Sequence, residues 1–257
     1  MALFMDGPIS TIDDLSAQDS QLADVASADG IDVTQKLALA QEHVAQELEG
    51  LLAGMGRPEQ SLWRSARLSL HHVAVTPALK LWHTYRTLEI VYADAYNNQL
   101  NDRYAGKRDQ FRSMASWAYD KFVRIGAGIV YDPIPRATKP TLTAVEAAAG
   151  ALPDGIYFVT MAWVNQAGEE GASAEANTIS TAAATLAVQP RDPPKSAVAW
   201  NVYAGIDAGS MFRQNGAPIP AGLSWTQPSM LTTTGPRAGQ GQEPAFFRPM
   251  PRVLLRG

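Results

Sequence analysis

Residues 126–135, Gly-Ala-Gly-Ile-Val-Tyr-Asp-Pro-Ile-Pro, decide how this sequence divides into parts. Upstream of them, apolar residues recur at helical spacing, and downstream the apolar runs are short and separated by turn residues. Pro133 and Pro135 cannot continue a helix, because proline lacks an amide hydrogen and also restricts the residue before it. We therefore place the main domain boundary in this stretch.

Four helices are predicted before the boundary. They cover about 16–29, 33–54, 76–100 and 107–125. Asp32 followed three residues later by Gln35 is a capping-box pattern, and Gly54 is a natural stop for the helix that begins there. Thr76-Pro77 supplies a cap and a first-turn proline for the third helix. Short connections between these helices predict a small bundle.

Short β-like runs follow the boundary. They cover 129–131, 141–145, 155–165, 174–181, 185–188, 197–204 and 211–214. Strands of this length and spacing within about a hundred residues are typical of a β-sandwich. Because side chains alternate along a strand, Val198, Trp200 and Val202 share one face, which predicts that Trp200 lies in the core. Tyr203 falls on the opposite face, where exposure is expected.

The fold class that follows is α+β and multidomain. We predict an N-terminal α-helical bundle over 1–127, a linker over 128–140, a β-sandwich over 141–235 and an extended C-terminal arm over 236–257. The arm alternates bulky apolar residues with proline and arginine, and a segment of that composition cannot bury itself.

Charge is distributed unevenly along the chain. Residues 1–50 hold ten acidic side chains and one basic one, whereas 51–139 hold thirteen basic and seven acidic ones. The net charge of −4 argues against a general nucleic-acid binder, whose domain is normally strongly basic. The basic residues around the fourth helix, which include Arg103, Lys107, Arg108 and Arg112, are interpreted as a solvated face or a protein interface rather than a DNA-contacting face.

Composition excludes several classes of chemistry. There is no cysteine, hence no disulfide, no thiolate metal site and no cysteine nucleophile. No apolar run approaches the ~20 residues of a membrane span, and residues 1–6 do not resemble a secretory signal, so a soluble and unsecreted chain is expected. Hydrophobic residues make up 46% of the chain, which is enough for a packed core.

Partial matches to catalytic and metal sites each have a simpler interpretation. His43 and Glu47, one helical turn apart, could share a metal, but an exposed pair on a polar face is favoured. Ser210 lacks the second half of a nucleophile elbow. The glycine-rich stretch 235–241 lacks the Lys-Ser/Thr of a phosphate-binding loop. We therefore predict no enzyme, no metal and no cofactor.

Two sets of motifs resemble known families. The first comprises TIDDL at 11–15, DVA at 24–26, GIDV at 30–33, KLALAQ at 36–41, NDRY at 101–104 and GIVYDPIP at 128–135. It resembles tailed-bacteriophage head-to-tail adaptor proteins, also called connector or head-completion proteins. The second comprises LPDGIYFV at 152–159, WVN at 163–165, GEEG at 168–171 and WNVYAG at 200–205. It is similar to the immunoglobulin or fibronectin type III-like modules that phage structural proteins often carry.

The first resemblance implies a structural virion protein at the portal vertex or neck, assembled in the host cytoplasm. It would form a homo-oligomeric ring of twelve subunits that joins the portal to the tail. The implied partners are the portal protein, tail or stopper and nozzle proteins, the capsid and other copies of the chain. Genomic DNA would pass through the channel without sequence-specific binding, and no membrane is involved.

The resemblance also implies where contacts form. A C-terminal arm would bind the portal or a neighbour through Phe246, Phe247, Arg248, Met250, Arg252, Val253, Leu254, Leu255 and Arg256. The charge split adds a predicted subunit interface of Asp13, Asp14, Arg103, Lys107, Arg108 and Arg112. The alternative function is a phage tail, baseplate or decoration protein whose β domain binds host-surface glycan. The aromatic residues Trp163, Trp200, Tyr203 and Trp225 suggest such a platform, for which exposed ones such as Tyr203 and Trp225 would have to line a shallow groove.

Overall fold

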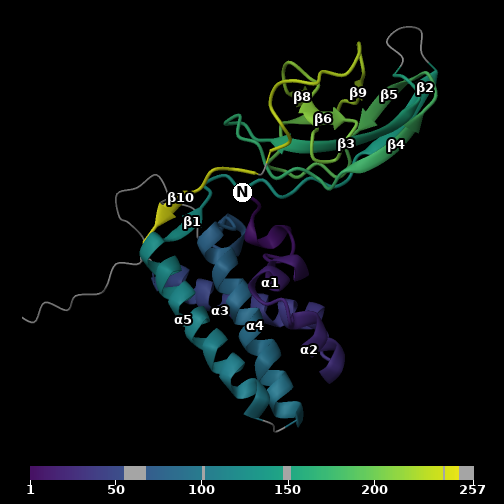
Figure 1. Cartoon of the computed structure of the whole chain (residues 1–257). Helices are drawn as coiled ribbons and strands as arrows, with labels where there is room; N and C mark the ends of the chain where they lie inside the picture. The colour runs from purple at the N-terminus through teal and green to yellow at the C-terminus, as the bar shows by residue number, and fades with distance from the viewer. Residues whose placement is uncertain (55–67, 100–101, 147–151, 240, 249–257) are drawn as a thin grey trace, which may run out of the picture. The chain divides into compact units, whose positions relative to one another are not determined.

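The structure, a computed structural model, describes residues 1–54, 68–99, 102–146, 152–239 and 241–248 (Figure 1). The chain forms two compact units. The helical unit contains Gly7–Ile129 and the chain from Pro244 onward, and the β unit contains Met1–Asp6 and Val130–Glu243. The predicted α+β arrangement is confirmed, and most of the β unit is an insertion within the helical unit.

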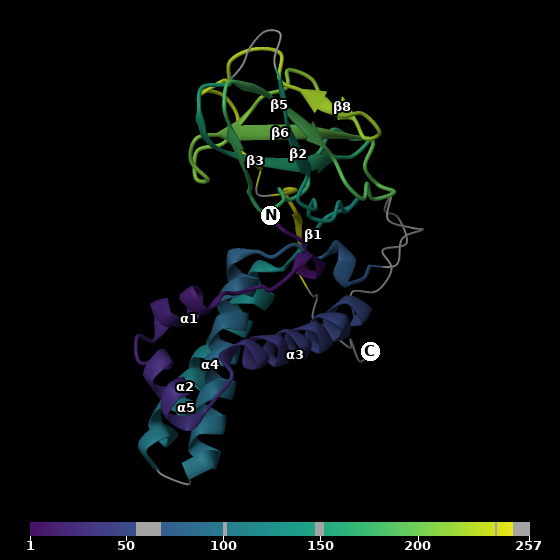
Figure 2. The same cartoon turned by 90° about the vertical axis from the view of Figure 1, so that its right-hand side faces the viewer.

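The helical unit is organised around one central helix. Its described α-helices are α1 (Ile12–Gln18), α2 (Leu22–Asp29), α3 (Val33–Gly54), α4 (Pro77–Gln99) and α5 (Ala105–Ile125), with short 3-10 turns η2 (Leu70–His72) and η3 (Asp102–Tyr104). Helix α4 contacts each of the other four helices. Figure 2 shows α5 running beside α4, whereas α3 crosses it.

Two predicted helix starts are confirmed by their caps. The Asp32 carboxylate accepts hydrogen bonds from the backbone N–H groups of Thr34 and Gln35 at the start of α3. The Thr76 hydroxyl accepts a hydrogen bond from the backbone N–H of Leu79 at the start of α4. Each side chain satisfies amide hydrogens that have no partner inside the first turn of a helix.

The helix predicted over 16–29 is wrong, because the chain forms two helices there. The break lies at Asp19, whose backbone is extended, with φ −146° and ψ 103°. Asp19 is 5% exposed, and its carboxylate accepts hydrogen bonds from the Tyr92 hydroxyl of α4 and from Lys107 Nζ of α5. Since the stabilising contacts come from distant helices, no local pattern could predict this break.

Aromatic side chains fill the space between α4 and α5. The Phe111 ring lies 5.4 Å from the Tyr92 ring and 6.5 Å from the Tyr85 ring, measured between centroids. Trp82 stacks on Phe122 with a centroid distance of 5.5 Å. These residues belong to the apolar stripes that helical spacing predicts, and burying each ring contributes about 2–3 kcal/mol.

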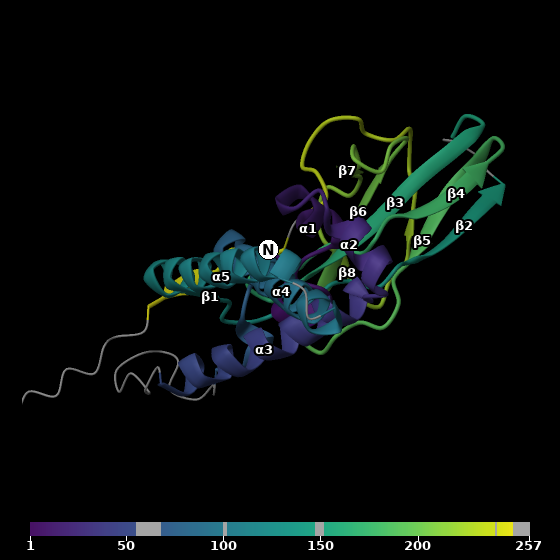
Figure 3. The same ribbon diagram turned by 60° about the horizontal axis from the view of Figure 1, so that its bottom comes forward.

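The β unit contains two antiparallel sheets. Its strands are β2 (Thr141–Glu146), β3 (Gly155–Val164), β4 (Asn177–Thr181), β5 (Ala184–Gln189), β6 (Ala199–Gly205), β7 (Phe212–Arg213), β8 (Ile219–Pro220) and β9 (Trp225–Thr226). One sheet has the order β2-β5-β9, and the other has the order β4-β3-β6-β7 with β8 also paired to β6 (Figure 3). The strands of two or three residues are too short to show the alternation of apolar and polar residues by which a strand is predicted from sequence.

Both sheets contribute to one hydrophobic core. Trp163 of β3 lies opposite Trp200 of β6 in register, and both are buried against Val188 of β5. The predicted burial of Trp200 is confirmed. Val198, which the alternation places on the same face, precedes β6 and is 52% exposed.

A two-stranded sheet joins the two chain segments that make up the helical unit. Strand β1 (Ala127–Ile129) pairs with β10 (Ala245–Phe247), and Val73 forms a further antiparallel bridge with Ile129. Gly126 is required where the strands meet, since its φ is +105° and a Cβ atom there would lie 2.6 Å from the carbonyl oxygen of Phe247. The strand predicted over 129–131 therefore lies two residues earlier.

The described parts of the predicted linker and arm belong to the folded units. Within 128–140, Ile134 and Ala137 are buried in the core of the β unit. Within 236–248, Arg237 forms an antiparallel bridge with Phe212, Gln242 is buried, and the next strand is β10. The compact units thus differ from the predicted ranges. Described parts of the predicted linker and arm pack or pair with the folded units, although their composition suggests segments without regular structure.

Candidate functional site

The two predicted acidic interface residues occupy the first turn of α1. Asp13 is exposed, whereas Asp14 is held within the chain. Lys80 Nζ lies 2.8 Å from Asp14 Oδ1, and Asp14 forms a reciprocal capping box with Thr11. Burial opposes ionisation of Asp14, but the bonds from Lys80 and Thr11 outweigh it and hold the pKa of the carboxyl below its usual value. Asp14 therefore joins α1 to α4.

Two of the predicted basic interface residues also pair within the chain. Lys107 Nζ lies 3.3 Å from Asp19 Oδ2, and Arg112 Nε lies 3.3 Å from Glu89 Oε1. The carboxylates of Asp19 and Glu89 are 3% and 11% exposed. A buried carboxylate needs such a partner, since an unpaired charge in the interior is costly. Lys107 and Arg112 therefore have structural roles.

The other two basic residues lie against aromatic rings. The Arg103 guanidinium lies 5.4 Å from the Tyr104 ring centroid, and that of Arg108 lies 4.5 Å from the centroid of Tyr96. Arg108 also pairs with its neighbour Asp109 at 2.9 Å. The structure does not gather the six predicted residues into one surface cluster of free charges, and their role at a subunit interface stays a prediction.

Part of the charge split along the sequence is resolved inside one molecule. Lys36 of α3 pairs with Asp94 of α4 at 2.7 Å, in addition to the Asp14–Lys80 and Asp19–Lys107 pairs. All three contacts join residues 1–50 to residues 51–139, and in two of them the acid comes from the N-terminal segment. The uneven charge distribution therefore contributes to packing of the helices within the chain.

The predicted arm divides into described and undescribed parts. Phe246 and Phe247 lie in β10, where they pair with Gly128 and Ala127 of β1. Arg248 Nε donates a hydrogen bond to the carbonyl oxygen of Ile125 at 3.3 Å. The remaining arm residues, Met250, Arg252, Val253, Leu254, Leu255 and Arg256, lie outside the described residues.

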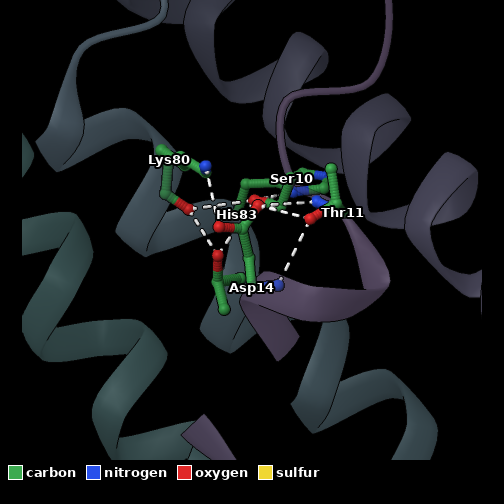
Figure 4. Close-up of polar contacts among 6 residues, drawn as sticks. Ser10, Thr11, Asp14, Lys80 and His83 are labelled. Atoms are coloured by element: carbon green, nitrogen blue, oxygen red, sulfur yellow. Dashed lines mark hydrogen bonds and ion pairs between the residues drawn. The ribbon is translucent and has the colours of Figure 1, made fainter. Parts of the chain in front are cut away.

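A buried serine and histidine connect the N-terminal part of the helical unit to α4 (Figure 4). Ser10 and His83 are each fully buried, and Ser10 Oγ lies 3.0 Å from His83 Nδ1. His83 Nε2 lies 3.2 Å from the carbonyl oxygen of Leu37, and Ser10 Oγ lies 2.9 Å from Thr84 Oγ1. These contacts tie the segment before α1, helix α3 and helix α4 together.

The hydrogen-bond partners define the state of His83. A carbonyl oxygen can only accept, so Nε2 carries the proton and Nδ1 accepts from the Ser10 hydroxyl. Burial lowers the pKa of His83 to about 4, although the bond to Leu37 and the charge of Asp14 oppose this shift. His83 is neutral at pH 7. Because neither Ser10 nor His83 is accessible, this pair is structural and is not a nucleophile and base.

A cleft of about 500 Å³ lies between α3, α4 and α5. Its lining includes His43 and Glu47 from α3, Trp82 and Arg86 from α4, and Tyr119 from α5. The Trp82 and Tyr119 rings are tilted against each other with a centroid distance of 4.9 Å. An aromatic wall and a guanidinium group therefore face the same space, and such a combination can hold a planar group by stacking.

The guanidinium in the cleft is fixed by its neighbours. Arg86 Nη1 donates to Glu89 Oε2 at 2.7 Å, and Arg86 Nη2 donates to His43 Nδ1 at 3.3 Å. Glu89 also accepts from Arg112, so one buried carboxylate is shared by two arginines. Burial raises the pKa of Tyr119, and the charges of Glu47 and Asp120 raise it further. Tyr119 is therefore protonated at neutral pH.

Sequence reasoning singled out His43 and Glu47 as a possible metal pair but missed the cleft that contains them. Among the residues that the structure describes, no group of three or more His, Asp or Glu side chains could hold a metal ion. The missed residues are Arg86 and Glu89. A charged pair within the largely apolar helix predicted over 76–100 is the signal that could have indicated them, because charge on a packed helix requires partners.

The aromatic residues proposed as a glycan platform are buried. Trp163, Trp200, Tyr203 and Trp225 are each at most 9% exposed. The expectation that Tyr203 is exposed is wrong, because its hydroxyl donates to the Glu170 carboxylate in the interior of the β unit. Burial raises the pKa of Tyr203, and the hydrogen bond to Glu170 raises it further. These rings cannot stack on a sugar without rearrangement of the core.

Comparison of the sequence with protein-family models and with curated proteins finds no match. Among the described helices, none has the length and apolar character needed to cross a membrane.

Proposed function

We propose that this protein is a structural component of a virion that forms a ring joining the portal to the tail, that is, a head-to-tail adaptor. The observation that supports this is the location of the adaptor-like sequence segments, most of which lie in the helical unit. The segments that resemble adaptor proteins fall mainly in α1, α2, α3 and η3 of this unit, and the last one begins in β1 and continues into the β unit. An adaptor needs extensive contact surface rather than a reaction centre. The charged residues described in this unit are consistent with such a role, because they stabilise contacts between helices.

The β unit is proposed to be an immunoglobulin or fibronectin type III-like sandwich. Its strand order supports this, since β4-β3-β6-β7 reproduces the order of strands C′, C, F and G in such folds. Strands β2 and β5 pair as strands B and E do. In the proposed assembly this unit contacts neighbouring virion proteins, namely the capsid or the first tail component.

The C-terminal residues 249–257 are proposed to bind the portal. They follow directly on β10, which pairs with β1, so this segment starts from the helical unit. Pro249 and Pro251 restrict the backbone and reduce the entropy lost when an extended segment is ordered on a partner. The apolar side chains between the arginines supply the anchors for a groove or a sheet edge.

Native mass measurement of the full chain tests the ring. We expect a closed oligomer of about twelve subunits, alone or on addition of the portal protein from the same virus, because cyclic oligomers form when one heterologous contact closes on itself. A monomer at all concentrations, both alone and with portal protein, would contradict the proposal.

Two truncations separate portal binding from folding. Ending the chain after Arg248 keeps β10, and we expect a folded protein that no longer co-purifies with the portal. Ending it after Glu243 also removes β10, which should destabilise the helical unit because β1 loses its partner strand. If the first truncation still binds the portal, the proposed role of residues 249–257 is wrong.

A further inference from the structure

Helix α5 exposes two different faces besides the one that packs on α4. Its buried stripe contains Phe111, Ala115, Ala118 and Phe122. Ser116 and Tyr119 line the cleft on one side of this stripe, whereas Trp117 is absent from the cleft lining. At 3.6 residues per turn, Trp117 and Tyr119 point roughly 160° apart around the helix axis. The cleft and Trp117 therefore cannot contact each other within one copy of the chain.

Trp117 is an unusual residue for a solvent-facing helix position. Its side chain is 51% exposed, and Lys121 Nζ lies 5.7 Å from its ring centroid. A large aromatic ring left in water gains apolar burial when a partner covers it, and tryptophan is among the residues that dominate binding energy at interfaces. Within the part of the chain that the structure describes, Lys121 forms no ion pair.

The cleft has the properties of a receptor for such a ring. Its volume of about 500 Å³ exceeds that of an indole, and its lining includes the Tyr119 ring and the Arg86 guanidinium. Trp82 also lines the cleft but is only 5% exposed, so Tyr119 and Arg86 are the groups available for stacking. Arg86 is already oriented by Glu89 and His43, so little side-chain freedom remains to be lost on binding. Guanidinium and aromatic groups both stack on an indole.

The charges beside the cleft and beside Trp117 are complementary. Glu47 is exposed at the cleft and is not ion-paired to any described residue, whereas Lys121 lies one helical turn from Trp117. Asp120 is the acidic neighbour of Lys121 on α5, and three residues after Trp117 it also lies one helical turn from that ring. An indole entering the cleft of another molecule would bring Lys121 to the side of the cleft where Glu47 is available.

We propose that Trp117 of one copy inserts into the cleft between α3, α4 and α5 of the next copy, with Lys121 facing Glu47. Because Trp117 and the cleft lie on different faces of one molecule, the contact between copies is head-to-tail. A contact of this kind closes into a ring or extends as a filament. This inference rests on the proposed ring and names the contact that builds it. The partner is a second copy of this chain.

Single substitutions in the full chain test the contact by native mass spectrometry and light scattering. Trp117→Ala is expected to weaken subunit association by about thirtyfold or more, which is the effect of losing a dominant interface residue. Glu47→Lys and Lys121→Glu are each expected to weaken it by about tenfold. Glu49→Lys is the matched control, because Glu49 is an exposed acid of α3 outside the cleft lining, and it should leave assembly unchanged.

Combined substitutions make the test specific. The double variant Glu47→Lys with Lys121→Glu should recover assembly, since each contact takes one residue from each copy. A mixture of Trp117→Ala and Glu47→Lys chains should stop at one-to-one dimers, because only one intact contact can form. Far-UV circular dichroism of every variant should match that of the unsubstituted chain.

The outcomes separate this contact from the ring itself. Rings that persist in both Trp117→Ala and Glu47→Lys would overturn the contact and leave the adaptor proposal standing. Failure of the double variant to recover assembly, while Glu49→Lys assembles normally, would also overturn the contact. A monomeric unsubstituted chain, alone and with portal, would overturn both proposals.

Discussion

The helical unit and the β unit satisfy their buried polar groups by different means. In the helical unit the buried polar groups include, besides serine and threonine hydroxyls, the titratable side chains of Asp19, His83 and Glu89, which bridge separate helices. Asp19 is shared by Tyr92 and Lys107, and Glu89 is shared by two arginines. Helix backbones satisfy their own hydrogen bonds except at the ends, so the polar side chains are available to join one helix to another.

In the β unit the buried polar groups are mainly side-chain amides that bind backbone. Asn215 Oδ1 accepts from the N–H of Val202, and Gln227 Oε1 accepts from the N–H of Leu186. Gln242 Oε1 accepts from the N–H of Ile134 at 2.8 Å. The strands here are short and their connections long, so amide side chains complete hydrogen bonds that no neighbouring strand supplies.

This difference predicts that the two units respond to different perturbations. Proton concentration should act mainly on the helical unit, where burial lowers the pKa of His83. Amide deletion and loss of core volume should act mainly on the β unit. Four substitutions test this contrast, and they are ordered by the size of the effect expected.

The largest effect is expected from Trp200→Ala in the core shared by both sheets. Trp200 is fully buried, and its removal should lower the free energy of unfolding by about 3–5 kcal/mol, because transfer and cavity costs add. Urea denaturation followed by far-UV circular dichroism measures this loss. Ile206→Ala is the control, since Ile206 is 77% exposed and should change stability little. A loss below about 1 kcal/mol for Trp200→Ala would show that the core tolerates a large cavity.

The second effect is a pH dependence that His83 confers on the helical unit. The unfolded side chain binds a proton near pH 6.5, whereas burial lowers the pKa of folded His83 to about 4. Between these values the unfolded state binds more protons, so this contribution is complete above pH 6.5 and is lost as the pH falls toward 4. The shift corresponds to about 3 kcal/mol.

His83→Gln isolates this contribution, because glutamine can still donate to the Leu37 carbonyl but does not titrate. Urea denaturation at pH 7 and pH 4 should show a smaller acid destabilisation for His83→Gln than for the unsubstituted chain. His71→Gln, at an exposed position, should keep the full pH dependence. Equal acid destabilisation in all three proteins would refute the assignment to His83. Asp14 does not interfere, since its lowered pKa places its titration below this interval.

The third effect is expected from Gln242→Ala in the β unit. The substitution leaves the buried N–H of Ile134 without its acceptor and removes donors to Asp132 O and to Glu169. We expect a loss of about 1–3 kcal/mol in the free energy of unfolding, which is the cost of an unsatisfied buried group. Gln166→Ala, at an exposed turn position, is the control. Equal stabilities of the two variants would argue against a role for amide side chains in completing the sheets.

The smallest effect is expected from Thr11→Ala at the start of α1. The variant loses the hydroxyl that accepts from the Asp14 N–H and donates to the Asp14 carboxylate, but it keeps the backbone N–H that donates to the same carboxylate. The loss should cost about 1 kcal/mol. Ser27→Ala, at an exposed position inside α2, is the control and should be neutral. Thermal unfolding measures both, and a destabilisation by Ser27→Ala as large as that by Thr11→Ala would contradict the capping role.

Local chemistry made much of the helical unit predictable. Asp32 and Thr76 mark the starts of α3 and α4, and Gly30 and Gly126 lie immediately after α2 and α5. A cap acts within one turn, so its effect can be inferred from adjacent residues. The break at Asp19 escaped prediction because its partners are about seventy and ninety positions away, at Tyr92 and Lys107.

The candidate site was less predictable than the fold. His43 and Glu47 share a side of α3 by their spacing alone, but their position beside Arg86 and Tyr119 depends on how α3 and α5 pack on α4. Likewise, alternation correctly predicts burial of Trp200 but places Tyr203 on an exposed face. The polar partner that holds Tyr203 inside, Glu170, comes from a different segment.

The amino-acid sequence by itself determined the starts of α3 and α4, the ends of α2 and α5, the change from helical to strand periodicity near Gly126, and the apolar stripes that form both cores. These features depend on interactions among residues a few positions apart. Only the tertiary structure decided that β10 returns to pair with β1, that Asp14 and Asp19 are paired within the chain, and that a cleft forms beside Arg86. Contacts between distant segments depend on the packing of whole elements, which no local pattern encodes.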